Sequence, residues 1–209
     1  MNKNHLLHNL SYIKELYIII ILLNIYGFYN NNPIYYLSIL LILCLLFFYR
    51  NNYIHTDTKY FISPSSSRVM DIIETKNENI IINHISLFDR HFMIAPVDCK
   101  VIDIQNIHID NNDAERKRVT FQDIDGNIFS IDQIVNKLFS HMFIYGFLPS
   151  FIYKERCVVF SKVGDYLKQG ERYGLIRFGS MIQYNLPKKY KLNIQKNIHY
   201  SLGCNIAFL

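Results

Sequence analysis

The segment Gly164–Pro187 reads GDYLKQGERYGLIRFGSMIQYNLP and carries the clearest structural signal in the chain. Two glycine-marked turns, at Gly164 and Gly170, precede an apolar run of β-prone residues. The dipeptide Gly179-Ser180 interrupts this run, and alternating apolar residues then lead to the proline. The pattern predicts a strand, a break at small residues and a second strand. A serine hydroxyl that follows a glycine carbonyl in a strained turn is placed to attack that carbonyl.

Two internal repeats predict that the domain around this segment is duplicated. Ile62–Ile72 matches Ile94–Ile104 at an offset of 32 residues, with identical isoleucines, proline, valine and aspartate. Gly170–Ile176 matches Gly203–Leu209 more weakly, at an offset of 33 residues. Each unit reads as a turn that feeds a strand. Interleaved units of this kind predict a compact β barrel or barrel-sandwich with pseudo-twofold symmetry.

Three further elements are expected between the repeats. The polar stretch Asp110–Arg118 predicts a loop. Asp125-Gly126 predicts a hairpin turn between Val119–Phe121 and the β-prone residues that follow. The apolar spacing within Gln133–Tyr145 predicts one short amphipathic helix. The expected fold class is therefore mainly β, of the α+β type, with a short helix.

Residues 1–50 predict a transmembrane helical hairpin that anchors a β domain formed by residues 51–209. Two apolar runs, Leu16–Phe28 and Ile34–Tyr49, are separated by an uncharged asparagine–proline turn. Basic residues flank both ends of the hairpin, which places both ends and the β domain on the cytoplasmic side of the membrane. They are Lys3, Lys14, Arg50 and Lys59. The alternative is a buried helical hairpin in a soluble protein.

Composition agrees with a membrane-bound protein and argues against a nucleic-acid partner. Of the 209 residues, 50% are hydrophobic and 19% are charged, and the net charge of +5 suits an anionic membrane surface. The densest basic run, Arg116–Arg118, is expected to be a solvated loop. The four cysteines form no CxxC pair, so we expect neither a zinc site nor a disulfide framework. They are Cys44, Cys99, Cys157 and Cys204, and small buried thiols in a reducing compartment are expected.

Several motifs in the same order resemble the short, membrane-anchored phosphatidylserine decarboxylases, including archaeal relatives that act on archaetidylserine. The most specific is Arg177-Phe178-Gly179-Ser180 with the turns before it, which is similar to that family's processing motif. The others are the histidine segment Ile85–His91 with Ala95–Asp98, the Ser-Pro segment Phe61–Pro64, the Glu-Arg segment Ala114–Arg116, the dipeptide Gln133-Ile134 and the apolar runs that end at Phe47–Arg50. The resemblance covers nearly the whole chain.

The resemblance implies a proenzyme that cleaves itself between Gly179 and Ser180 into residues 1–179 and 180–209. Ser180 would become a covalent pyruvoyl cofactor, whose carbonyl forms a Schiff base with the amine of a serine phospholipid. Decarboxylation would then give an ethanolamine phospholipid. His91 is the implied acid and base, because the pKa of histidine lies near the working pH. Glu115 and Arg116 are candidate contacts for the lipid headgroup.

The chain departs from the family pattern beside the expected site. The family's Ser-Pro segment continues with an aspartate that orients the histidine, and Ser66 stands in that place. Asp98, which the repeat aligns with Ser66, and Asp89 are possible substitutes. Cys99 replaces a glycine that the family prefers.

Two other functions stay open at this point. The chain is either a working decarboxylase or a non-catalytic, membrane-bound relative that keeps the fold without processing. A lipoyl or biotinyl carrier domain also contains paired glycine turns, but it presents a modified lysine at a hairpin tip. Lys162 and Lys196 lack that setting.

Overall fold

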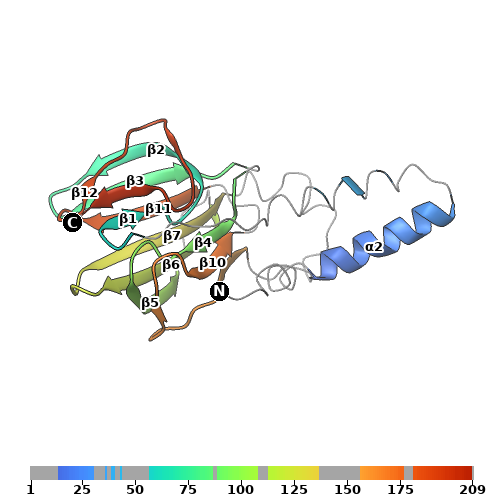
Figure 1. Ribbon diagram of the computed structural model, residues 1–209, viewed down its shortest axis with the longest axis horizontal. Helices are drawn as coiled ribbons and strands as arrows, with labels where there is room; N and C mark the ends of the chain where they lie inside the picture. Colours follow the sequence, from blue (N-terminus) through green and yellow to red (C-terminus); the bar gives the residue numbers. More distant parts are fainter. Residues whose placement is uncertain are drawn as a thin grey trace. The chain divides into compact units, whose positions relative to one another are not determined.

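A computed structural model defines a predominantly β protein with one described helix (Figure 1). The chain divides into two compact units, Met1–Tyr53 and Ile54–Leu209. The structure describes residues 14–30, 36, 39–40, 43, 57–86, 89–107, 113–136, 156–176 and 181–208.

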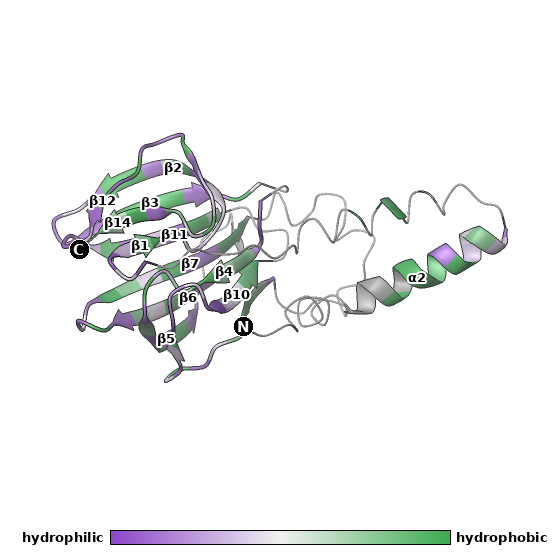
Figure 2. Ribbon diagram, in the orientation of Figure 1, coloured by the Kyte–Doolittle hydropathy of each residue, from purple (hydrophilic) through white to green (hydrophobic). Residues whose placement is uncertain are grey.

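The first unit contains helix α2, Lys14–Tyr29, which includes the first predicted apolar run. Apolar side chains such as Ile18, Leu22 and Phe28 are exposed along it, and Figure 2 shows the hydrophobic colour over much of its length. Among the described residues, no helix is both long and apolar enough to cross a bilayer. The second apolar run lies largely outside the described residues, so the membrane hairpin stays a prediction.

The second unit consists of one antiparallel eight-stranded sheet and two three-stranded sheets (Figure 1). The large sheet has the order β13 (His199–Tyr200), β2 (Ser67–Glu74), β3 (Glu78–His84), β11 (Met181–Pro187), β7 (Ile128–Asn136), β6 (Asp113–Asp123), β5 (Cys99–Asn106) and β9 (Tyr166–Leu167). One small sheet contains β1 (Tyr60–Ile62), β14 (Asn205–Phe208) and β12 (Lys191–Leu192). The other contains β4 (Phe92–Ile94), β10 (Arg172–Ile176) and β8 (Cys157–Val159).

An aromatic cluster joins the three sheets. Phe121 and Phe129 face each other across the β6–β7 pair, with ring centroids 5.2 Å apart. Phe61 of β1 packs edge-on against Phe129 at 5.3 Å, and Tyr173 of β10 packs edge-on against Phe121 at 5.0 Å. Both small sheets therefore cover the inner face of the large sheet. Burial of these rings stabilises the packing of both small sheets on the large sheet.

Equivalent hydrogen bonds in the two halves confirm the predicted duplication. The Ile62 N–H donates to the Pro96 carbonyl at 3.0 Å, and the Ile94 N–H donates to the Pro64 carbonyl at 3.1 Å. The long strand of each repeat has a register shift at the same place, after Val69 in β2 and after Val101 in β5. Each repeat thus contributes one short strand, a proline turn and one bulged long strand.

The equivalence extends upstream of the second repeat. Asn197 donates to the Val69 carbonyl at 2.7 Å, as Gly164 does to Val101 at 2.8 Å, and both donors have a positive φ, 66° and 100°. Two turn caps are also equivalent. Asp98 Oδ1 accepts the Gln169 N–H at 2.7 Å, and Ser66 Oγ accepts the Leu202 N–H at 3.1 Å.

Two sequence predictions are wrong in this region. The predicted loop Asp110–Arg118 overlaps β6, whose polar residues pair with β7. The first residues of the predicted helix, Gln133–Asn136, belong to β7, and Gln133 and Ile134 pair with β11. Pairing on both sides of β7 outweighs the local helical spacing. The remainder of the predicted helix lies outside the described residues. The predicted hairpin at Asp125-Gly126 is confirmed between β6 and β7.

A methyl group at Gly174 should destabilise the domain. A Cβ there would lie 2.6 Å from the Val158 carbonyl oxygen and 2.7 Å from Gln133 Nε2. We expect Gly174→Ala to lower the free energy of unfolding by about 1–3 kcal/mol, measured by urea titration. The matched site in the second repeat is Ala207, which is buried and already carries a methyl group. Ala207→Gly should cost about 1 kcal/mol. An unchanged urea midpoint for Gly174→Ala would contradict the close approach.

Candidate functional site

The buried side chain of His91 is the centre of the candidate site. It lies between the end of β3 and the start of β4, and 4% of it is exposed. The Asp89 carbonyl accepts a hydrogen bond from Nδ1 at 2.9 Å. Since a carbonyl oxygen can only accept, Nδ1 carries the proton and Nε2 carries the lone pair. Burial lowers the pKa of His91 to about 4, although the Asp89 carbonyl and carboxylate act in the opposite direction. The imidazole is therefore neutral near pH 7 and able to accept a proton.

Backbone contacts connect His91 to the strand that leads into the glycine–serine motif. The His91 carbonyl accepts the Ile176 N–H at 2.9 Å, and Ile176 is the last residue of β10. Strand β11 begins at Met181, immediately after the motif. Gly179 and Ser180 themselves lie outside the described residues. Strand β10, which ends at Ile176, and strand β11, which begins at Met181, are both paired, as the opening segment predicts.

The carboxylate of Asp89 contacts a different histidine. Its Oδ1 lies 2.6 Å from His199 Nε2, and its Oδ2 accepts the Ser86 N–H at 2.8 Å. His199 lies on β13, and we did not predict a role for it from the sequence. The repeat offset of 33 residues, extended upstream, aligns His199 with Tyr166. Both residues lie in short strands at the two edges of the large sheet, so the repeat would have predicted a strand at His199.

Ser66 and Asp98 each cap a turn in the C-terminal part of the chain. Ser66 accepts the N–H of Leu202, and Asp98 accepts the N–H of Gln169. Ser66 is surrounded by other buried serines. Ser65 Oγ lies 2.7 Å from the Tyr184 hydroxyl and donates to Ser67 Oγ at 3.1 Å. Uncharged hydroxyls thus fill the place where the family pattern has a carboxylate. Direct assistance to His91 by Asp98 or Ser66 stays a prediction.

Glu115 and Arg116 both bind neighbouring parts of the fold. The Glu115 carboxylate accepts the N–H groups of Arg156 and Cys157, at 2.8 and 3.0 Å. Arg116 Nε donates to Asp132 at 2.9 Å, and Arg118 donates to both oxygens of the same fully buried carboxylate at 2.7 and 2.8 Å. These contacts bind this part of β6 to Asp132 of β7 and to the start of β8. Contact with a lipid headgroup stays a prediction for both residues.

Two buried polar side chains on the same side of the sheet were not predicted as site residues. Lys117 and Gln133 are direct partners in the β6–β7 register, and both are buried. Among the described residues, neither amide atom of Gln133 has a hydrogen-bond partner. No periodicity or motif in the sequence distinguishes an inward-facing glutamine from an outward-facing one.

The cysteines in the described residues are free thiols. Cys99 and Cys157 are buried, as predicted, and burial raises the pKa of Cys99 to about 12. Burial is also the main cause of the raised pKa of Cys157. Cys204 is exposed, which contradicts the prediction for that residue. Cys99, which replaces the glycine that the family prefers, is therefore a small, unreactive core residue.

A row of register partners that contains four basic residues crosses the large sheet beside Met181. Across the strands from β13 to β6, consecutive partners in the register are His199, Arg68, His84, Met181, Ile134 and Arg116. Neighbouring strands in a sheet are about 4.8 Å apart, so several basic side chains lie within about 25 Å. Two members of this row already contact carboxylates, Arg116 that of Asp132 and His199 that of Asp89. Arg68 is exposed and is therefore the member of the row best placed to attract an anionic group.

The duplicated domain and its histidine segment match one protein family. The family model described as phosphatidylserine decarboxylase matches residues 43–207. The chain therefore belongs to the phosphatidylserine decarboxylase family.

Individual relatives are distant. The chain is 31% identical over 110 residues to a phosphatidylserine decarboxylase proenzyme of Geotalea uraniireducens, covering 52% of this chain and 48% of the relative. It is 26% identical over 161 residues to a protein assigned as an archaetidylserine decarboxylase proenzyme in Methanosarcina mazei, covering 73% and 68%. A proenzyme of Ralstonia nicotianae is 26% identical over 149 residues, covering 64% and 62%. The alignments thus span from about half to two thirds of these relatives. No solved structure was found to match the chain.

The low pKa of His91 predicts a specific pH dependence of stability. The pKa is lower in the folded state than the usual value of 6.5, so the unfolded state binds the proton more tightly. The stabilising contribution is complete above about pH 6.5 and is lost as the pH falls through about 4. We expect a loss of up to about 3 kcal/mol across this range.

The measurement is urea unfolding of Ser180→Ala protein between pH 4.5 and 7.5, since this variant lacks the hydroxyl that the expected self-cleavage would need. His91→Gln in the same background is the matched control and should flatten this part of the profile. Identical profiles for the two proteins would contradict a buried, neutral His91.

Proposed function

We propose that this chain is a proenzyme that cleaves itself between Gly179 and Ser180 and then decarboxylates a serine phospholipid. The observation that carries the proposal is the placement of His91. The imidazole of His91 is buried and neutral, with its proton on Nδ1. The backbone carbonyl of His91 accepts a hydrogen bond from the Ile176 N–H. Three residues separate Ile176 from Ser180 in the sequence. The family and the names of the relatives supply the reaction.

His91 acts as the general base for cleavage. Its Nε2 accepts the proton of the Ser180 hydroxyl as Oγ bonds to the Gly179 carbonyl carbon. The C–N bond between the two residues then breaks, the freed amine takes up a proton, and an ester remains. A base with a low pKa holds a proton weakly, so His91 also returns it readily.

Elimination completes the processing. The Cα proton of Ser180 is removed, and the Cβ–Oγ bond breaks. Gly179 leaves as a carboxylate, and a dehydroalanine remains at residue 180. One water molecule then replaces the nitrogen at Cα, and ammonia is released. The product is a pyruvoyl group at the start of residues 180–209.

The residues around the motif fit such a group. Because the group is made from Ser180, β11 holds it, and β11 pairs with β3 on one side and β7 on the other. When present, a pyruvoyl group supplies a carbonyl that accepts the electrons released with carbon dioxide. His91 then accepts the proton that the ammonium group of the substrate must lose, and returns it to the carbon that has lost the carboxylate.

The proposed substrate is a phospholipid with a serine headgroup. Such a headgroup carries a phosphate, a carboxylate and an ammonium, and its net charge is negative. Arg68 lies in the row beside Met181 and is exposed, and its guanidinium favours this charge. The apolar surface of α2 and the predicted hairpin of residues 1–50 support a membrane location. The basic residues that flank the hairpin favour the cytoplasmic side for the β domain.

One observation favours the alternative of a non-catalytic relative. Ser66 replaces the family aspartate, and its hydroxyl is used in the cap of Leu202. A serine cannot stabilise an imidazolium by charge as a carboxylate does. The alternative keeps the fold and the lipid surface without processing.

Self-cleavage is the decisive measurement. Full-length protein purified in detergent should separate into residues 1–179 and 180–209, and mass spectrometry should find a pyruvoyl-blocked short fragment. Ser180→Ala should abolish cleavage, and His91→Ala should reduce its rate by about 100-fold or more. Ser201→Ala, an exposed serine in the same fragment, is the matched control. An intact wild-type chain would reject the enzyme and favour the non-catalytic relative.

Ser66→Asp separates the two functions further. Asp98 at the equivalent turn shows that a carboxylate can cap this position, so Ser66→Asp should fold. Under the alternative, the added carboxylate should restore cleavage to an inactive chain. Under the leading proposal, cleavage occurs in the wild type and increases no more than modestly.

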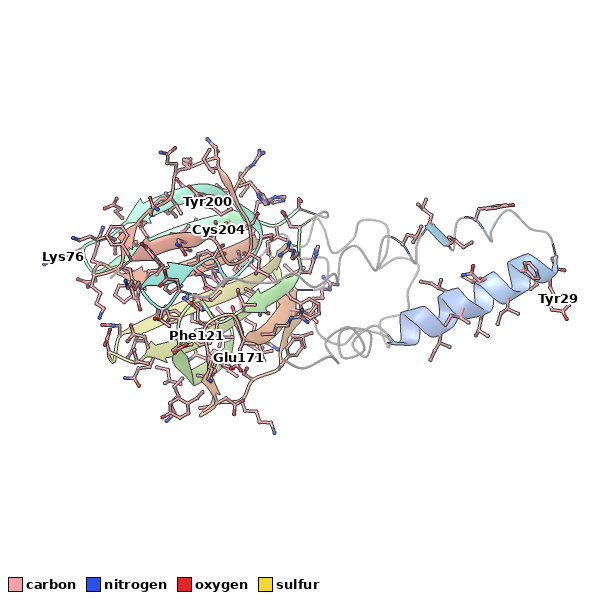
Figure 3. The ribbon with its side chains drawn as sticks, in the orientation of Figure 1. Tyr29, Lys76, Phe121, Glu171, Tyr200 and Cys204 are labelled. Atoms are coloured by element: carbon pink, nitrogen blue, oxygen red, sulfur yellow. The ribbon has the colours of Figure 1, made fainter. Side chains whose placement is uncertain are left out.

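Arg68 should contribute to substrate binding and not to chemistry. We expect Arg68→Ser to raise KM severalfold at low salt, with kcat unchanged and the difference reduced at high salt. Lys76→Ser is the matched control, because Lys76 lies in the turn beyond the far end of β2 (Figure 3). Equal KM values for both variants would remove Arg68 from the site.

A further inference from the structure

The side chain of Asp89 links two segments that are distant in the sequence. Asp89 lies between β3 and β4, and only 8% of it is exposed. His199 lies on β13 at the edge of the large sheet, and 43% of its side chain is exposed. Asp89 Oδ1 and His199 Nε2 are 2.6 Å apart. The contact joins the turn that carries His91 to the C-terminal part of the chain.

The same residue orients His91 through its backbone. The Asp89 carbonyl accepts the Nδ1 proton of His91 at 2.9 Å. The direction of this carbonyl depends on the conformation of Asp89, and that conformation is fixed at both carboxylate oxygens, by Ser86 and by His199. The Asp89 N–H also donates to the Ser86 carbonyl at 3.1 Å, so loss of a carboxylate contact would loosen the carbonyl direction and not release the turn.

We propose that His199 is a positioning residue that holds His91 in its reactive orientation through Asp89. The inference rests on the proposed function, because it assigns His91 as the base. It also replaces the sequence-based idea that the Asp89 carboxylate itself contacts the reactive imidazole. His199 holds the Asp89 carboxylate, and the Asp89 carbonyl holds His91.

The contact differs from an ordinary surface ion pair. Lys196 and Asp71 form such a pair at 2.8 Å, in the same C-terminal segment and against the same strand β2. Both of those side chains are about half exposed, whereas the Asp89 carboxylate is buried. Exposed pairs contribute little to positioning, because water competes for both partners. Lys196→Leu is therefore the matched control.

Two amide variants isolate the hydrogen bond from the charge. In His199→Gln, the side-chain Nε2 is the same number of bonds from the backbone as the imidazole Nε2, so it reaches Asp89. In His199→Asn, the amide is one carbon shorter and does not reach. We expect His199→Gln and Lys196→Leu to cleave at the wild-type rate. His199→Asn should cleave about 10- to 100-fold more slowly, with an unchanged melting temperature.

A spectroscopic measurement tests the position of His91 without any activity. In uncleavable Ser180→Ala protein, nitrogen NMR of the imidazole reports which nitrogen of His91 carries the proton. Adding His199→Asn should shift the signal away from the pure Nδ1–H form, and adding His199→Gln should not. Asp89→Asn, which keeps the volume of the side chain, is the second variant and should behave as His199→Asn does.

The outcomes separate this inference from the proposed function. An intact wild-type chain rejects self-cleavage, and the NMR comparison still tests the positioning role. Wild-type cleavage rates and unchanged His91 signals in both His199→Asn and Asp89→Asn would overturn the inference while leaving the proposed function in place.

Discussion

Two backbone hydrogen bonds interlock the halves of the domain. The Ile62 N–H binds the Pro96 carbonyl, and the Ile94 N–H binds the Pro64 carbonyl. Each short strand therefore depends on the proline turn of the other repeat, and neither repeat completes its backbone pairing alone. The small sheets and the aromatic cluster that they cover follow from this arrangement. So does the site, because β4 begins one residue after His91.

The framework could be predicted from the sequence because the repeated residues lie at the turns and register shifts of the strands. Proline ends each short strand, and aspartates at the register shifts, Asp71 and Asp103, bind the N–H of the next residue at 3.0 and 2.8 Å. The hairpin at Gly126 was equally predictable, because its positive φ of 84° favours glycine. These signals are local, and a repeat doubles them.

The errors arose where distant partners decide the structure. The residues before Arg118 resemble a loop only when Asp132 is ignored, since that buried carboxylate accepts hydrogen bonds from two arginines of β6. Gln133 has helical neighbours in the sequence, but strands on both sides of β7 determine its conformation. His199 belongs to no motif, and its proposed positioning role depends on a contact with Asp89, which is 110 residues away in the sequence. Every residue has a backbone carbonyl, so a carbonyl that orients a histidine cannot be predicted from the type of residue.

The position of β11 has a consequence for the proposed two-chain protein. The bond before Ser180 lies at the entrance to a strand that is paired along its length with β3 and along most of it with β7. A new chain end is ordinarily free to fray, but this one would begin inside the large sheet. The short chain would then behave as an obligate subunit, released only when the whole domain unfolds. Reassembly would be a bimolecular reaction between two chains, so its rate would depend on protein concentration, and the mature protein would have no simple route back to its folded state after denaturation.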